Sequence, residues 1–209
     1  LTFICDGRLA LSLAEIVLAS FKDCDVAPLA GGPLGACAGV AIVHAHAPFS
    51  QAYDLAESLC AMAKARLRAA NKTGDYALDW HVGLVRGGNI SRLREDQSDA
   101  ATGKPYILGH PDERLTWLWL DHAVLGEDAS SLRGTMWAKR RNKVKELGDI
   151  CMDAPDELDA RLEKWKVVEP SLRLPEGLKD GLILDALELF DLHQPLRNGL
   201  SEETVHGSA

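Results

Sequence analysis

A run of small and apolar residues from 35 to 45, GACAGVAIVHA, most constrains the fold of this chain. Such a run is typical of a central strand that is covered on both faces of its sheet. Several positions carry alanine or glycine, so another backbone or a ligand can approach the strand closely; these are Ala36, Ala38, Gly39 and Ala41. The run therefore predicts a buried central strand with room for a close neighbour.

Strand and helix signals precede this run. Residues 1–5, LTFIC, predict a strand, and residues 8–22 predict a helix because their apolar residues recur at helical spacing. Asp6 stands where an acidic residue caps the N-terminus of such a helix. Residues 23–34 are rich in proline, glycine and aspartate, which predicts a loop.

A second helix and strand follow the run. Pro48 suits the first turn of a helix, which we predict over residues 49–70, and the stretch 71–75 carries stop signals. Alternating apolar residues then predict a half-buried strand over 76–85. The first half of the chain therefore alternates strands and helices.

The alternation of strand and helix patterns ends after residue 85. The polar, glycine-bearing stretch 86–105 predicts a loop, after which strand signals stop. Helical patterns separated by glycine and proline follow, over residues 113–124, 131–147, 155–165 and 181–192. We therefore predict an α/β (α+β) region over residues 1–100 and a small helical region over residues 101–209.

Composition and charge narrow the function classes. No stretch is long and apolar enough to cross a bilayer, and no signal-peptide pattern opens the chain. Five cysteines with no C-x-x-C pair predict the reduced, buried thiols of a cytoplasmic protein. The net charge of -8 disfavours sequence-blind nucleic-acid binding, but two basic clusters leave local phosphate sites open. The clusters are Lys64, Arg66, Arg68 and Lys72, and Arg133, Lys139, Arg140, Arg141, Lys143 and Lys145.

Three motifs in the first half resemble one protein family. Residues 37–49, CAGVAIVHAHAPF, are similar to the strand and turn SAGIAI…HH..YP of that family. The helix residues 52–57, AYDLAE, with the later Ala63-Lys64 pair, resemble its A..LAE.LL..AK helix, and residues 78–82, LDWHV, resemble its LDFH strand. The family is the GGDD-type palm domain of the large, polymerase-like subunits of type III CRISPR effector complexes, together with standalone relatives.

The resemblance implies a fold for the chain and the point in that fold at which the chain begins. The opening residues 1–7, LTFICDG, resemble the strand that follows Gly-Gly-Asp-Asp in these proteins, so we expect the chain to begin just after that metal-binding hairpin. The implied fold is a partial ferredoxin-like palm domain, a nucleotide polymerase and cyclase fold, followed by the helical extension. The resemblance covers about the first half of the chain.

The resemblance also implies an activity for the full-length protein. In this family two carboxylates of Gly-Gly-Asp-Asp hold two Mg²⁺ ions, which bridge the phosphates of ATP while AMP units are joined into cyclic oligoadenylate, an antiviral second messenger. Gly-Gly-Asp-Asp is not in this chain, and Asp6, the nearest acid, is expected to cap a helix. We therefore expect this fragment to supply part of an ATP pocket, without catalytic acids, in a cytoplasmic protein.

Lys64 and Arg68 are the candidate nucleotide-binding residues. By resemblance, the lysine of the Ala63-Lys64 pair reaches the triphosphate, and a compact ammonium on a flexible stem suits phosphate oxygen. Arg68 lies one helical turn further on the same face and would add a bidentate contact. The alternative is a solvated, basic helix end that favours the helix dipole.

Two further residue pairs carry a weaker signal. His44 and His46 share one face of a strand, but zinc needs at least three protein ligands and no third is evident nearby. We expect them to mark a polar strand end. Asp79 and His81 also share a face, and we expect a hydrogen bond at a sheet edge there rather than catalysis.

Three other segments have structural interpretations. The glycines of residues 31–35 lack the lysine and the strand–loop–helix order of a phosphate-binding loop. Trp117 and Trp119 are expected to anchor packing or an interface. For the basic run over residues 133–145 we expect a solvated helix face, with contact to RNA or to a partner subunit as the alternative.

Two rival functions remain open at this stage. One is a catalytically inactive palm domain that serves as a scaffold for protein and RNA assembly. The other is a GGDEF-type cyclase that makes a dinucleotide. The second fits less well, because the HAHAPF turn at residues 44–49 and the helical extension resemble the CRISPR branch more.

Overall fold

The structure is a computed structural model that describes residues 1–22, 35–72, 74–85, 90, 103–108, 124, 126, 129–175, 182–194 and 196. Within these residues a mixed sheet has the strand order β1-β2-β3. Strands β1 (Ala36–Ile42) and β2 (Tyr76–Val82) are parallel, and the short β3 (Tyr106–Ile107) is antiparallel to β2. The chain is therefore a mixed α/β protein, as predicted.

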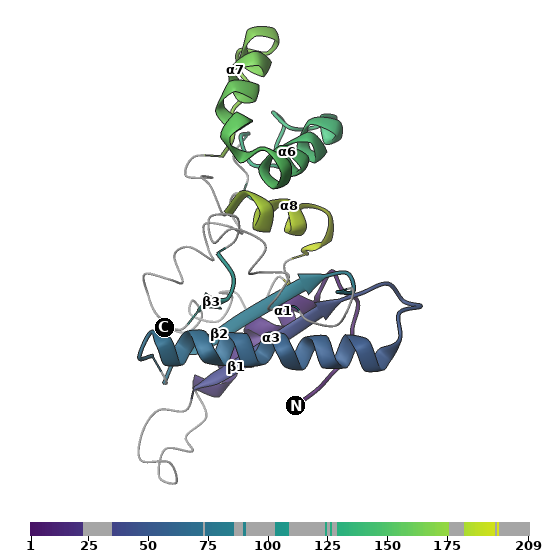
Figure 1. Cartoon of the computed structure of the whole chain (residues 1–209), viewed down its shortest axis with the longest axis vertical. Coiled ribbons are helices and arrows are strands. Elements are labelled where there is room, and N and C mark those ends of the chain that lie inside the picture. The colour runs from purple at the N-terminus through teal and green to yellow at the C-terminus, as the bar shows by residue number, and fades with distance from the viewer. Residues whose placement is uncertain are drawn as a thin grey trace, which may run out of the picture.

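Two helices cover opposite faces of β1 and β2 (Figure 1). Helix α1 (Ala10–Lys22) packs its buried residues into the main core together with Leu78 and Trp80, while α3 (Phe49–Ala69) buries Leu59 and Ala63 on the other side. The alternation of side chains along β2 separates these two sets, because successive residues point to opposite faces. The sheet thus forms the middle of three layers.

Gly39 explains why α3 lies so close to β1. A Cβ atom at this position would overlap the carbonyl oxygen of Ala56 and the backbone nitrogen of Cys60, and it would stand 2.9 Å from the Cβ of Leu59. The predicted close approach to the small-residue strand is therefore confirmed, and the neighbour is the backbone of a helix. Asn71 ends this helix region with φ 54°, and Lys72 donates its N–H to the carbonyl of Leu67, which confirms the predicted stop.

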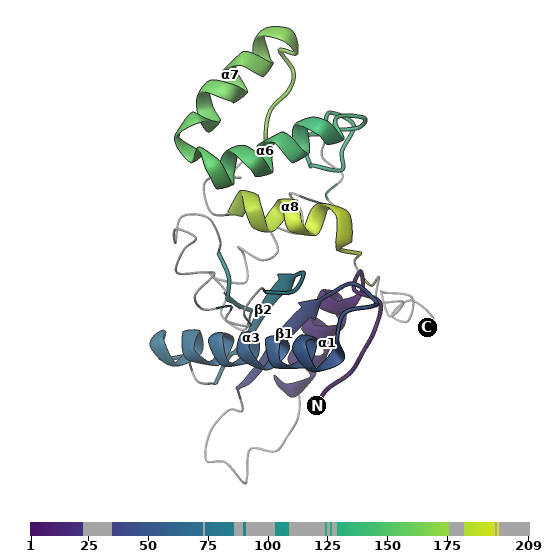
Figure 2. The same cartoon turned by 45° about the vertical axis from the view of Figure 1, so that its right-hand side comes forward.

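The described residues from 129 onward are mainly helical. Helices α6 (Arg141–Asp153), α7 (Leu158–Val168) and α8 (Leu182–Leu192) follow one another, with the 3₁₀ turn η2 (Pro155–Glu157) before α7. In Figures 1 and 2, α8 lies between the sheet and α6, and α7 lies at the far end. One buried apolar cluster runs continuously from α1 through β2 to all three helices.

Hydrogen bonds connect the C-terminal end of α8 to α1 and to the turns before α6. Just beyond its C-terminal end, the N–H of Gln194 donates to the carbonyl of Arg8, and the hydroxyl of Ser12 donates to the carbonyl of Gln194 at 3.0 Å. The guanidinium of Arg133 donates to the carbonyls of Leu189 and Phe190, which lie in the last turn of the helix. The two bonds of Gln194 therefore join the start of α1 to the end of α8, and those of Arg133 hold the end of α8 from the other side of the sequence gap.

The strand predicted over residues 1–5 is wrong. These residues lie in no strand and are exposed. Asp6 accepts the N–H of Arg8 at 2.9 Å and pairs with its guanidinium at 2.6 Å, so it caps the turn that leads into α1 at Ala10. These hydrogen bonds from Arg8 lower the pKa of Asp6 to about 2.

Other element boundaries also differ from the prediction. Residues 131–140 form turns, and α6 begins only at Arg141, because Lys139 takes a left-handed φ of 65° that breaks a helix. The prediction that strands stop after residue 85 is wrong, since Tyr106 and Ile107 pair with β2. Among the described strands β2 is the central one and β1 lies at the end, whereas the sequence placed β1 in the centre.

The ferredoxin-like part of the fold prediction is not confirmed. In a split βαβ arrangement another strand separates the two parallel strands. Here β1 pairs directly with β2 over seven residues, with Gly39 opposite Asp79. The predicted helix over 113–124 lies outside the described residues except for Val124. The division near residue 100 stays a prediction.

Candidate functional site

Lys64 and Arg68 lie one turn apart in the C-terminal half of α3. Both side chains are exposed, and each directly follows a buried position, Ala63 or Leu67, that packs against the sheet. The helix is thus held rigidly by its apolar stripe while the two cations project beside it. The structure therefore leaves both predicted residues accessible to a ligand.

Cys37 of β1 packs against the part of α3 that carries the two cations. Cys37 faces α3, and burial, with a smaller contribution from Cys60, raises the pKa of its thiol. The charges of Lys64 and Arg68 both oppose that rise, so both act at Cys37. The thiol of Cys60 donates to the carbonyl of Cys37 at 3.4 Å. Two cations one helical turn apart on an exposed helix face can contact a single polyanionic ligand.

The cysteines in the described residues are free thiols. They are Cys5, Cys37, Cys60 and Cys151. Burial also raises the pKa of Cys151, which keeps that thiol in its neutral form. Cys24 and the glycines of residues 31–35 lie outside the described residues.

The two histidines lie together in the turn between β1 and α3. The ring centroids of His44 and His46 are 5.3 Å apart, and the N–H of His46 donates to Nδ1 of His44 at 3.3 Å. That bond occupies one of the ring nitrogens that would otherwise bind a metal. The described part of the chain contains no group of three or more histidine, cysteine, aspartate or glutamate residues placed to hold a metal ion.

Asp79 and His81 do not lie at a sheet edge as predicted. They belong to β2, the central described strand, on the face that α3 covers. Asp79 is fully buried opposite Gly39, and His81 is half-buried. The sheet-edge expectation was wrong because the short strand β3, which covers the start of β2, left no pattern in the sequence.

Most of the predicted basic run serves the protein itself. Besides Arg133, which caps α8, Arg140 and Lys143 flank the carboxylate of Glu169, and Arg141 pairs with Asp191 at 2.7 Å. Lys143 also lies 5.3 Å from the ring centre of Trp165. Lys139 and Lys145 are exposed. The run is therefore only partly the solvated helix face that was predicted; Trp117 and Trp119 lie outside the described residues.

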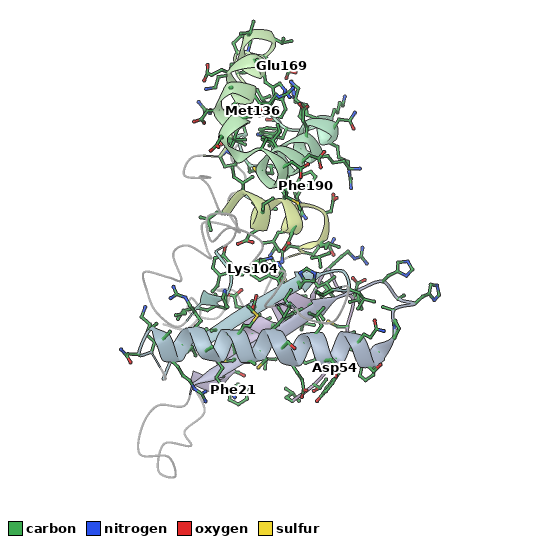
Figure 3. The ribbon with its side chains drawn as sticks, in the orientation of Figure 1. Phe21, Asp54, Lys104, Met136, Glu169 and Phe190 are labelled. Carbon is green, nitrogen blue, oxygen red and sulfur yellow. The ribbon has the colours of Figure 1, made fainter. Side chains whose placement is uncertain are left out.

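A largely buried polar cluster between the sheet and α8, which we call the Lys104 cluster, was missed by the sequence analysis. Lys104 lies between the sheet and α8 (Figure 3). It pairs with Glu188 at 2.5 Å and with Asp185 at 3.4 Å. The hydroxyl of Tyr106 and the N–H of Gly103 each donate to Asp185 at 2.8 Å. The indole N–H of Trp80 donates to Glu188 at 3.0 Å. These bonds join the strands β2 and β3 to α8.

The geometry of the Lys104 cluster gives it a structural role. The side chain of Lys104 is 5% exposed and that of Asp185 is 0% exposed. Trp80 stacks on Tyr106 with ring centroids 5.3 Å apart, and Lys104 lies 4.9 Å from the Trp80 ring centre, while the side chain of Glu188 is 31% exposed at the border of the cluster. Burial and the charge of Asp185 raise the pKa of Tyr106, so its phenol stays neutral and donates. One signal was available: Asp185 and Glu188 interrupt the otherwise apolar α8 sequence.

Comparison with known proteins adds no identity. No family model, no curated protein and no solved structure matches the chain. Within the described residues, no helix has the length and apolar character needed to cross a membrane.

Proposed function

We propose that this chain is a nucleotide-binding palm module, whose exposed Lys64–Arg68 pair on α3 contacts the phosphates of ATP. The observation that carries the proposal is that both cations are exposed, one helical turn apart, on a helix that packs against the sheet. The sequence resemblance of residues 1–85 supplies the family. The ferredoxin-like palm fold is part of the same proposal.

The proposal extends to the full-length protein. There the module would form one wall of the pocket in a type III CRISPR polymerase-like subunit or a standalone relative, and the whole protein would make cyclic oligoadenylate in cytoplasmic antiviral defence. Other subunits of the complex and RNA are the proposed partners. The expected Mg²⁺ ions find no matching ligand set among the described residues, and Asp6 is held by Arg8. No step of the proposal therefore passes through a metal ion bound by this chain.

The chemistry proposed for this chain is phosphate binding and orientation. Lys64 supplies a point charge, and Arg68 supplies a planar fork that can hold two phosphate oxygens. Neither residue needs to move a proton. We expect residues 1–209 alone to make no cyclic product, since the acids that would hold the catalytic ions are absent from the sequence.

ATP binding tests the proposal directly. We expect ATP to stabilise the wild-type chain in a thermal-shift assay and to bind in isothermal titration, because a ligand that binds only the folded state raises the melting temperature. Lys64→Ala should weaken binding roughly tenfold, which corresponds to about 1.4 kcal/mol. Lys164→Ala is the matched control, since Lys164 is also an exposed lysine on a helix.

The competing ligands separate phosphate recognition from base recognition. Inorganic tripolyphosphate should compete with ATP, and adenosine should not. If ATP does not bind, or if Lys164→Ala weakens it as much as Lys64→Ala does, the nucleotide site is wrong. The inactive scaffold then becomes the better interpretation of the fold.

A further inference from the structure

Two cysteines lie at the contact between β1 and α3. Cys37 belongs to β1 and packs against buried residues of α3, and Cys60 belongs to α3. The thiol of Cys60 donates to the backbone carbonyl of Cys37 at 3.4 Å, and both residues are half-buried free thiols. We propose that Cys37 and Cys60 form a redox-active pair, which a hydroperoxide oxidises to a disulfide between β1 and α3.

The close packing of the two elements brings the sulfur atoms within reach of each other. A carbonyl oxygen lies about 2.4 Å from its own Cα, so Sγ of Cys60 lies within about 6 Å of Cα of Cys37. Cysteines joined by a disulfide have Cα atoms roughly 4.4–6.8 Å apart. Gly39, on the same face of β1 as Cys37, lies directly against the backbone nitrogen of Cys60. Rotation about the Cα–Cβ bonds is therefore the main movement that the cross-link requires.

The oxidation balances with a hydroperoxide as the oxidant. The sulfur of one thiolate attacks the O–O bond, an S–O bond forms, and the leaving oxygen takes up a proton as water or alcohol. The second sulfur then attacks the sulfenic sulfur, the S–S bond forms, and the hydroxide leaves as water with the remaining thiol proton. The two cysteines lose two hydrogen atoms in all, and the peroxide is reduced. A small thiol reductant reverses the change by exchange.

The surroundings of the pair assign the first attack to Cys60. Burial raises the pKa of Cys37, and the neighbouring thiol of Cys60 adds to that rise, while the charges of Lys64 and Arg68 oppose it. Cys37 is therefore mainly a neutral thiol, and only a thiolate is a good nucleophile. The second step is intramolecular, so a small thiolate fraction at Cys37 is sufficient there.

The cross-link would fasten the helix that carries the proposed phosphate-binding residues. Cys60 stands one turn before Lys64 on α3, and the disulfide would join that turn to β1. Disulfides inside cells are usually transient and redox-sensing, so a reversible bond suits the compartment proposed for this protein. The inference does not depend on nucleotide binding, because its test follows the sulfur atoms themselves.

Peptide mapping of the peroxide-treated, folded chain tests the pair. The whole chain is treated with hydrogen peroxide at low protein concentration and digested without reduction by a protease that cleaves before aspartate. Asp25 and Asp54 then place Cys24, Cys37 and Cys60 on three different peptides. We expect a species that joins the Cys37 and Cys60 peptides, lighter by two hydrogen atoms, and about tenfold more abundant than any other cysteine pairing. Dithiothreitol should separate it.

Three variants identify the reacting sulfurs. Cys60→Ala should remove the cross-link, and Cys37→Ala should leave a sulfenic acid on Cys60 that dimedone traps, whereas the wild type traps little. Cys151→Ala is the matched control, since Cys151 is a half-buried thiol on α6, and it should keep the cross-link. Melting curves confirm that each variant folds.

The wild-type map alone can overturn the proposal. It is wrong if the folded chain gives no peptide that joins Cys37 to Cys60, or if Cys24 links to either of them instead. It is also wrong if the cross-link forms only in urea, because any two cysteines of an unfolded chain can meet.

Discussion

Gly39 of β1 lies against the carbonyl oxygen of Ala56 in α3, so closely that no side chain fits between the strand and the helix. Contact between the two backbones depends on this one missing Cβ. A residue of another element, 25 positions before Lys64 in the sequence, therefore helps to position the helix that carries Lys64 and Arg68.

Gly39→Ala should destabilise the protein by about 3 kcal/mol or more, because the added methyl overlaps backbone atoms that cannot rotate away. For a chain of this size that loss lowers the melting temperature by roughly 6–12 °C. Gly148→Ala is the matched control: its Cβ meets Leu187 at 3.6 Å, and alanine favours a helix over glycine by about 1 kcal/mol. Equal melting temperatures for the two variants would refute the close-contact explanation.

Asp185→Asn should cost about 1–3 kcal/mol in urea unfolding, since it weakens the buried acceptor of Tyr106 and Gly103 and leaves Lys104 with Glu188 as its remaining carboxylate partner. Glu163→Gln removes an exposed partner of Lys166 and should cost less than about 1 kcal/mol. Adding Lys104→Met to Asp185→Asn should recover part of the loss, because both buried charges are then gone. A double variant that is simply the sum of its parts would show that the two residues are not coupled.

The lowered pKa of Glu169 predicts that the stability of the protein depends on pH. The hydrogen bonds from Lys143 and Arg140 lower its pKa from the ordinary 4.5. A carboxyl with a lowered folded pKa stabilises the protein fully above its unfolded pKa, and the contribution is lost as the pH falls through the folded value. Urea midpoints measured from pH 7 down to pH 3 should therefore decline less steeply for Glu169→Gln than for wild type below about pH 4.5. Parallel curves for the two proteins would contradict this role.

Arg133→Ala should destabilise the protein by about 1–3 kcal/mol, because the guanidinium donates charge-assisted hydrogen bonds to the last carbonyls of α8. Arg173→Ala, the same truncation at an exposed side chain, should change stability by less than about 0.5 kcal/mol. Hydrogen exchange should locate the effect at the end of α8. Faster exchange spread evenly over the chain would argue for a different role of Arg133.

The central part of the fold could be predicted because its signals are local. The small-residue strand, the helix after Pro48 and the alternating strand all follow from short-range periodicity, and β1, α3 and β2 lie where that periodicity placed them. Residues 1–5 have the residues of a strand but no partner among the described strands, so propensity alone misled the prediction. Strand β3 is two residues long, which is too short for any pattern.

The residues of the candidate site and of the polar cluster also differ in whether local sequence spacing could reveal them. Lys64 and Arg68 were found because helical spacing alone places them on one exposed face. The Lys104 cluster was missed because its members come from two separate regions, and only the tertiary fold brings Lys104 to Asp185. Most of the basic run is occupied by partners such as Glu169, which lies 26 residues beyond Lys143. Pairing over such distances in sequence leaves no local trace.

The hydrogen bonds between Gln194 and the first turn of α1 affect the choice of truncated variants. Ser12 and Gln194 stand 182 positions apart, yet they touch, and the apolar cluster between them is continuous. A shortened protein that ends near residue 100 would expose the part of the Leu78–Trp80 side of the sheet that α1 does not cover, and such exposed apolar surface promotes aggregation. Nucleotide titrations are therefore better performed on protein that retains α8 than on the first hundred residues by themselves.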